Sequence, residues 1–148
     1  LKVMFTTIKF TLPKNIQNQL MESCYMGNMI ARASYILLKK IINPTYSLNN
    51  YDIIEASNDF YDNLKKISIH SQASCLCLWS FVICGLVINE NDKRQYILYR
   101  IKEFGETKKS SSIMSIIKFL ETNWKKYSKY GEPWDIILDI NGFENVFI

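Results

Sequence analysis

The residues best suited to covalent chemistry are the single histidine and the cysteines that follow it. His70 lies a short way before Cys75 and Cys77. A cysteine beside a histidine can act as a nucleophile, because the imidazole accepts the proton of the thiol. Here the two cysteines belong to a long apolar stretch, and burial among apolar side chains raises the pKa of a thiol and makes it inert. The sequence therefore predicts no catalytic site and a protein that is not an enzyme.

A metal site is not indicated by the same residues. The chain has four cysteines and one histidine, and Cys75 and Cys77 would point away from each other on a helix. No set of four zinc ligands can be assembled from them at the usual spacings. We expect no metal and no cofactor, and we expect the cysteines to be free thiols in a reducing compartment.

Basic residues next to aromatic ones form a third pattern, between positions 118 and 130. Its members are Lys118, Lys125, Lys126 and Lys129 with Trp124, Tyr127 and Tyr130. Such groups can hold single-stranded nucleic acid by charge and by stacking. On a helix, however, Trp124 and Tyr127 would lie on the apolar side, so a solvated lysine face beside core aromatic residues is favoured. The net charge is only +4. No nucleic acid is expected as a partner, and a basic nucleic-acid-binding helical protein is the alternative.

The element that must position these groups is the stretch from Ala73 to Ile88, which holds no charged residue. Apolar side chains fall on every side of a helical wheel there, and a helix that is apolar all round must be buried. The stretch falls short of the roughly 20 residues that span a bilayer. It predicts the buried central helix of a bundle and no stable membrane span.

The other helices are expected to cover this central one. Apolar residues recur at helical spacing in five further segments, at about 15–42, 50–67, 92–104, 110–131 and 133–140. Pro44 would end the first segment and Pro133 would start the last. Gly105 is expected just past the end of the 92–104 helix. Residues 1–12 could form a strand or a short helix. A chain of 148 residues is one domain's worth, so we expect a single all-α domain over 1–148.

The 50–67 segment divides into two faces. Its apolar stripe is formed by Ile53, Phe60, Leu64 and Ile67. Its opposite face carries the acidic residues Asp52, Glu55, Asp59 and Asp62. Because these lack the glycine spacing of a calcium-binding loop, we expect them to face solvent.

One local pattern is similar to a family motif. Residues 131–138, GEPWDIIL, combine a turn, a proline at the helix start and a Trp-Asp pair before apolar residues. Asp135 would complement the helix dipole while Trp134 covers the core. This pattern resembles the second homology motif of the Bcl-2 family of apoptosis regulators. Residues 78–81, with Gly85, resemble the body of that family's first motif, and residues 35–64 resemble the two helices that line its groove.

The resemblance implies a Bcl-2-like helical bundle around a buried central hydrophobic helix, of a divergent viral type. Such a protein inhibits apoptosis by binding the amphipathic death-motif helix of pro-apoptotic proteins in a hydrophobic groove. By this resemblance the groove would be lined by Tyr35, Phe60, Leu64, Ser74, Leu78 and Phe81. Ser74 stands where the family has an arginine that meets the ligand's aspartate.

The partners that the resemblance implies are pro-apoptotic proteins of a host, with a Bim-like protein as the first expectation. An empty apolar groove would be an exposed patch, so self-association as a homodimer is expected as well. The missing arginine favours an alternative on the same fold, a scaffold that blocks innate immune signalling by protein–protein interaction. The implied location is the cytoplasm of the host cell, with association to mitochondria.

Overall fold

Residues 12–68, 70, 78–108, 112–127 and 131–139 are described by the structure, which is a computed structural model. Within them the chain forms six helices and no strand. In chain order these are α2 (Lys14–Ile42), α3 (Tyr51–Leu64), α4 (Leu78–Val87), α5 (Asn91–Lys108), α6 (Ser112–Lys126) and the 3-10 helix η2 (Pro133–Leu138). The all-α fold class predicted from the sequence is confirmed for this part of the chain.

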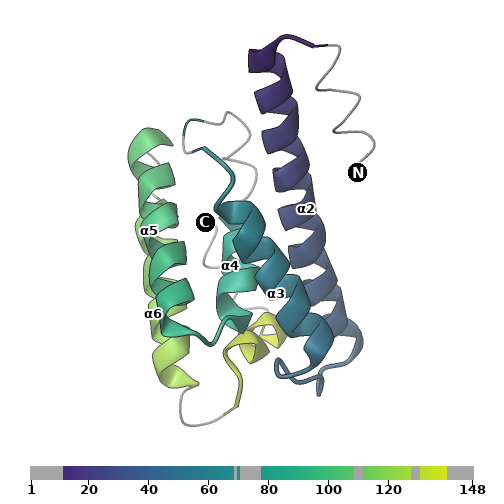
Figure 1. Cartoon of the computed structure of the whole chain (residues 1–148). Helices are drawn as coiled ribbons and strands as arrows, with labels where there is room; N and C mark the ends of the chain where they lie inside the picture. Colours follow the sequence, from purple (N-terminus) through teal and green to yellow (C-terminus); the bar gives the residue numbers. More distant parts are fainter. Residues whose placement is uncertain (1–11, 69, 71–77, 109–111, 128–130, 140–148) are drawn as a thin grey trace.

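α2 and α3 run antiparallel along one side of the bundle (Figure 1). The buried positions of α2 are Met26, Met29, Ala33, Ile36 and Lys40. Their spacing alternates between three and four residues, as one face of a helix requires. All five lie beyond the first third of the helix, and the start of α2 extends past the other helices (Figure 1). As predicted, α2 ends before Pro44.

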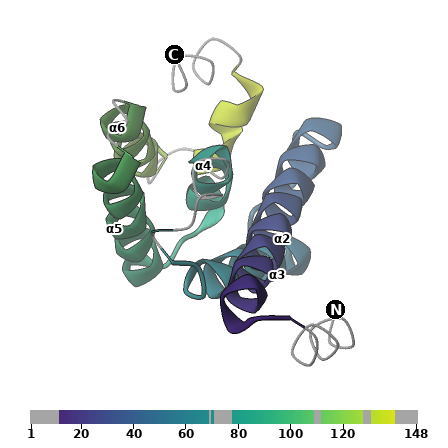
Figure 2. The same ribbon diagram turned by 90° about the horizontal axis from the view of Figure 1, so that it is seen from above.

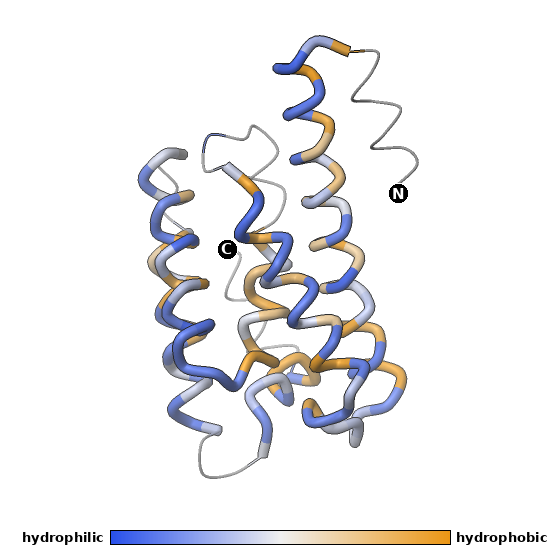
Figure 3. The backbone as a smooth tube through the Cα atoms, viewed as in Figure 1, coloured by the Kyte–Doolittle hydropathy of each residue, from blue (hydrophilic) through white to orange (hydrophobic). Residues whose placement is uncertain are grey.

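α4 is the central helix. It contacts every other described helix and lies between the α2–α3 pair and the α5–α6 pair (Figure 2). Every residue from Ser80 to Val87 is buried, as the absence of a polar face predicts. The surrounding helices keep a hydrophilic outer side, most visibly α5 (Figure 3). The predicted central helix is therefore confirmed over its described residues.

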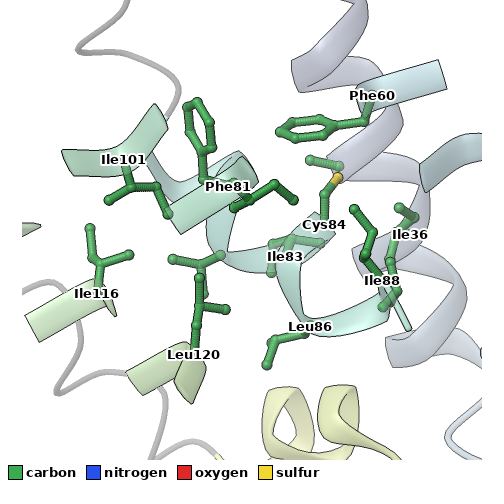
Figure 4. Close-up of a cluster of buried hydrophobic side chains, with 14 of the residues drawn as sticks. Ile36, Phe60, Phe81, Ile83, Cys84, Leu86, Ile88, Ile101, Ile116 and Leu120 are labelled. Atoms are coloured by element: carbon green, nitrogen blue, oxygen red, sulfur yellow. The ribbon is translucent and has the colours of Figure 1, made fainter. Parts of the chain in front are cut away.

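Aromatic rings join α4 to its neighbours on both sides. Phe81 of α4 meets Phe60 of α3 edge to face, with 5.7 Å between ring centroids (Figure 4). Its ring also meets Phe104 of α5 at 5.5 Å. Cys84, one turn further along α4, is buried, and burial raises the pKa of its thiol well above the ordinary value. This thiol is inert for the reason that the sequence suggested.

The α5–α6 contact corrects one prediction. Gly105 does not follow the end of α5, because the helix continues to Lys108. Gly105 instead faces Ile113 of α6, and a Cβ on it would lie 2.6 Å from two side-chain carbons of that residue. A glycine is needed here because two helices approach closely, not because a helix ends. The apolar face of α6 is as predicted, with Ile113, Ile116, Ile117, Leu120 and Trp124 buried.

The predicted last helix is a 3-10 helix and ends at Leu138. Trp134 has no exposed surface, which confirms that it covers the core. Several expectations fall outside the described residues: the conformation of 1–11, the roles of Ser74, Cys75 and Cys77, and everything after Asp139.

Candidate interaction site at the α2–α3 junction

Asp52, in the first turn of α3, is the centre of a cluster that we call the α2–α3 junction site. Its carboxylate accepts hydrogen bonds from the hydroxyl of Tyr35 on α2 at 2.7 Å and from that of Tyr46 in the connecting loop at 3.0 Å. It also pairs with the Nζ atom of Lys39 at 3.0 Å. Two tyrosines and one lysine thus converge on a single carboxylate.

The charges of this cluster stabilise each other. Partial burial raises the pKa of Asp52, but the hydrogen bonds from Tyr35, Lys39 and Tyr46 outweigh that effect and hold the pKa at about 2. The pKa of Lys39 is raised, first by its hydrogen bond with Asp52. The ammonium group also lies over both tyrosine rings, at 5.2 Å from the centroid of Tyr35 and 5.0 Å from that of Tyr46. The site is therefore electrically balanced by its own residues.

An apolar hollow of about 460 Å³ opens beside this cluster. It is lined by Tyr35, Leu38, Lys39, Ile42, Asn43 and Tyr46. Leu38 is 55% exposed and Ile42 is 79% exposed. Exposed apolar side chains that gather in one place are typical of an interaction surface. The hollow offers shape and apolar contact.

Among the described residues, His, Cys, Asp and Glu side chains form no group of three that could hold a metal ion.

The structure distributes the predicted groove residues over different environments. Phe60, Leu64 and Phe81 have no exposed surface and form part of the core. Leu78 packs against that core while partly exposed. A side chain without exposed surface cannot contact a docked helix. Phe60, Leu64 and Phe81 therefore stabilise the fold. Tyr35 lines the hollow of the α2–α3 junction site, and Ser74 lies outside the described residues.

The acidic face of α3 corrects a second prediction. Asp52 and Asp59 do not simply face solvent, since they pair with Lys39 and Arg32 of α2, the latter pair at 2.8 Å. The signal was present in the sequence. The two acids are seven residues apart (59 − 52) and so are the two bases (39 − 32), with the order reversed as antiparallel helices require.

A buried lysine ties this region to η2. Lys40 is 1% exposed, and its Nζ atom lies 2.5 Å from Oδ1 of Asp135 and donates to the carbonyl of Pro44 at 2.8 Å. It also lies over the ring of Trp134, at 4.7 Å from the centroid. Trp134 and Asp135, which the sequence singled out, therefore bind the ammonium group of Lys40.

Glu132 completes the connection. Its carboxylate accepts hydrogen bonds from the Ser47 hydroxyl at 2.6 Å, from the Leu48 backbone N–H at 3.0 Å and from Nε1 of Trp134 at 2.6 Å. The Asp135 carboxylate in turn accepts a bond from the Glu132 N–H at 2.9 Å. The α2–α3 loop is held against the C-terminal segment by this network.

Comparison with known proteins identifies the family. Residues 14–141 match the model of the fungal specific transcription factor domain, which is 128 of 148 residues (141 − 14 + 1). No curated protein and no solved structure matches the chain.

The match overturns the resemblance to the Bcl-2 family. The anti-apoptotic function, the immune-signalling scaffold on that fold, the viral origin and the death-motif partners, Bim-like proteins included, are wrong. The misleading features have causes common to many helical bundles. A tryptophan and an aspartate at a helix start satisfy the core and the backbone N–H groups, and an apolar central helix follows from burial alone.

Proposed function

The chain belongs to the fungal specific transcription factor domain family, and from this premise we propose that it regulates transcription by contacting other proteins. A domain of this family takes part in gene regulation in fungi and is not an enzyme. In our proposal residues 1–148 act as one helical domain. The α2–α3 junction site is its contact surface. The observation that carries the proposal is the family match over most of the chain.

The pairing of basic residues on α2 favours contacts with proteins over contacts with DNA. DNA is bound mainly through Lys and Arg side chains that are available to phosphates. Arg32, Lys39 and Lys40 are instead paired with carboxylates of this chain. What this end of α2 presents to a partner is apolar, since Leu38, Ile41 and Ile42 are all more than half exposed.

We place this activity in the nucleus, where a transcription factor acts. The expectation of a cytoplasmic protein near mitochondria depended on the Bcl-2 resemblance and is dropped with it. None of the helices in the described ranges combines the length and the apolar character that a bilayer span requires.

A tethering experiment tests the proposal. Residues 1–148 are fused to a DNA-binding domain of known specificity, and a reporter gene with its sites is measured in a fungal cell. We expect reporter expression to differ from that with the DNA-binding domain alone. Leu38→Asp with Ile42→Asp should abolish the difference by placing charge in the hollow. Met114→Asp is the matched control, because Met114 is 65% exposed on α6, away from the junction.

Two outcomes would contradict this function. One is a reporter that responds equally to the double variant and to the wild type, because the α2–α3 junction site would then not be the contact surface. The other is salt-dependent binding of the isolated chain to duplex DNA, which would show phosphate recognition.

A further inference from the structure

A second hollow, of about 320 Å³, lies where four segments of the chain meet. Its polar and aromatic lining comes from the α2–α3 loop, the α4–α5 turn, the end of α6 and the residues before η2. The side chains that matter here are Asn49, Asn89, Arg94, Trp124, Tyr127 and Glu132. We call it the Arg94 hollow. Its volume is at the lower end of the range for small-molecule sites.

Arg94 is held in a fixed position at this hollow. Its Nε atom donates to the carbonyl of Ile88 at 2.6 Å. Its guanidinium lies over the ring of Trp124, at 5.0 Å from the centroid. That ring is itself fixed, because its Nε1 atom donates to the carbonyl of Gly85 at 2.9 Å. The remaining contact is a long one, from Nη2 to Oδ1 of Asn89 at 3.4 Å. With respect to the described residues, most of the donors of the Nη atoms are therefore available to a ligand.

Arg94 differs from the other arginines, because it forms no ion pair within the described part of the chain. The other two arginines form ion pairs, Arg32 with Asp59 at 2.8 Å and Arg100 with Glu103 at 3.4 Å. Arg94 has no such pair there. Glu90, four residues before it, pairs with Lys93. Burial lowers the pKa of Arg94, and the charge of Glu90 opposes that effect. A partly buried guanidinium in this situation favours an anion.

Glu132 restricts the rest of the ligand. Its carboxylate lines the same hollow and already accepts three hydrogen bonds. A second anionic group close to it would be repelled, whereas a hydroxyl or an ammonium group could donate to this carboxylate. The lining therefore suits a small molecule with an anionic group at one end and a donor at the other.

We propose that the Arg94 hollow binds a small anionic metabolite, whose carboxylate or phosphate is held by the guanidinium of Arg94. The planar fork of arginine matches either anion with two parallel hydrogen bonds. Trp124 keeps that fork in place, and Tyr127 is a further part of the lining. Binding itself does not depend on the proposed role in transcription, so the two can be tested separately.

The test uses the purified chain and three probes: malate as a hydroxy acid, glucose 6-phosphate as a sugar phosphate, and glucose as the neutral control. Chemical shifts of the Trp124 indole N–H and the Arg94 Nε–H are followed by NMR during titration. We expect saturable shifts of both signals with malate or with the phosphate, and none with glucose. Which of the two anions binds more tightly distinguishes a carboxylate ligand from a phosphate ligand.

Variants decide whether Arg94 is responsible. Arg94→Gln should weaken binding about tenfold or more, as expected when hydrogen bonds to a charged group are lost. Lys102→Gln, which removes an exposed cation from the same helix, should leave it unchanged. If Arg94→Gln does not fold, Asn49→Asp serves instead, because it places a negative charge at the rim without touching the contacts of Arg94. No saturable shift with either anion, or an equal loss in Lys102→Gln, overturns the proposal.

Discussion

The α2–α3 junction site and the Arg94 hollow contain similar residue types and use their charges in opposite ways. At the junction, Lys39 and Asp52 neutralise each other and two tyrosines complete the cluster. In the Arg94 hollow the guanidinium has an aromatic platform and no carboxylate partner among the described residues. The first region exposes apolar surface, and the second exposes a cation that forms no ion pair with the described residues. Whether the fold supplies a counter-charge decides which role a basic residue can have.

The two regions share the α2–α3 loop. Asn43 and Tyr46 line the hollow of the junction, while Leu48 and Asn49 line the other hollow. Glu132 holds the loop through Ser47 and Leu48. A change at either region therefore has a direct structural route to the other, and the following variants separate their contributions.

The largest effect is expected from Trp134→Ala, because this residue supports both regions. Its ring lies under Lys40 and its Nε1 atom donates to Glu132. Removing a fully buried tryptophan should lower the free energy of unfolding by about 3–5 kcal/mol. Urea denaturation followed by circular dichroism measures it. A loss below about 1 kcal/mol would mean that the loop is held by other contacts.

The next effect compares adjacent lysines of α2. Lys40→Met leaves Asp135 without its partner and should cost about 2–3 kcal/mol, below the range for a fully buried pair because Asp135 is 36% exposed. Lys39→Met removes an exposed pair, which solvent screens, and should cost clearly less. Both are measured by the same denaturation. Equal losses would contradict the distinction between the buried and the exposed ion pair.

A third variant changes the packing of α5 against α6, the helix that carries Trp124 of the Arg94 hollow. Gly105→Ala would force a methyl group against Ile113 and should cost about 1–3 kcal/mol by overpacking. Gly85→Ala is the matched control, because its methyl group would meet only the flexible end of Leu120, at 3.0 Å. Thermal unfolding of the two variants gives the comparison. If Gly85→Ala is the more damaging, the close approach of α5 and α6 is not the critical one.

The smallest effect concerns pH at the junction. Since the pKa of Asp52 is about 2 in the folded protein and about 3.9 when unfolded, its contribution to stability is complete above the unfolded value. That contribution is lost as the pH falls from about 5 towards 2. Asp52→Asn should therefore show a weaker loss of stability with acid, by under about 1 kcal/mol because the pair is partly exposed. Identical pH profiles for variant and wild type would exclude Asp52 as the source.

The local chemistry of the helices could be predicted from the sequence. Proline positions and the apolar period limited α2 and α6, and the stripe of α3 was buried as expected. Trp134 was correctly placed in the core for the same reason, since a large apolar ring next to a helix start has few other places to go. The candidate site was found only at Tyr35. The family was misjudged, because a tryptophan and an aspartate at a helix start satisfy local needs of packing and hydrogen bonding that arise in unrelated helical bundles as well.

What the sequence by itself determined was an all-α chain built around one buried helix, since periodicity and the lack of charge are properties of neighbouring residues. Only the tertiary structure decided which charges meet. Lys40 and Asp135 are ninety-five positions apart (135 − 40) and form a buried pair, while Arg94 is left without one among the described residues. Gly105 belongs to the same class, because its role depends on Ile113 of the next helix. The hollow of the junction site is lined by residues between positions 35 and 46, whereas the Arg94 hollow exists only where segments distant in the sequence come together. Pairing between such segments is set by packing that no local pattern records.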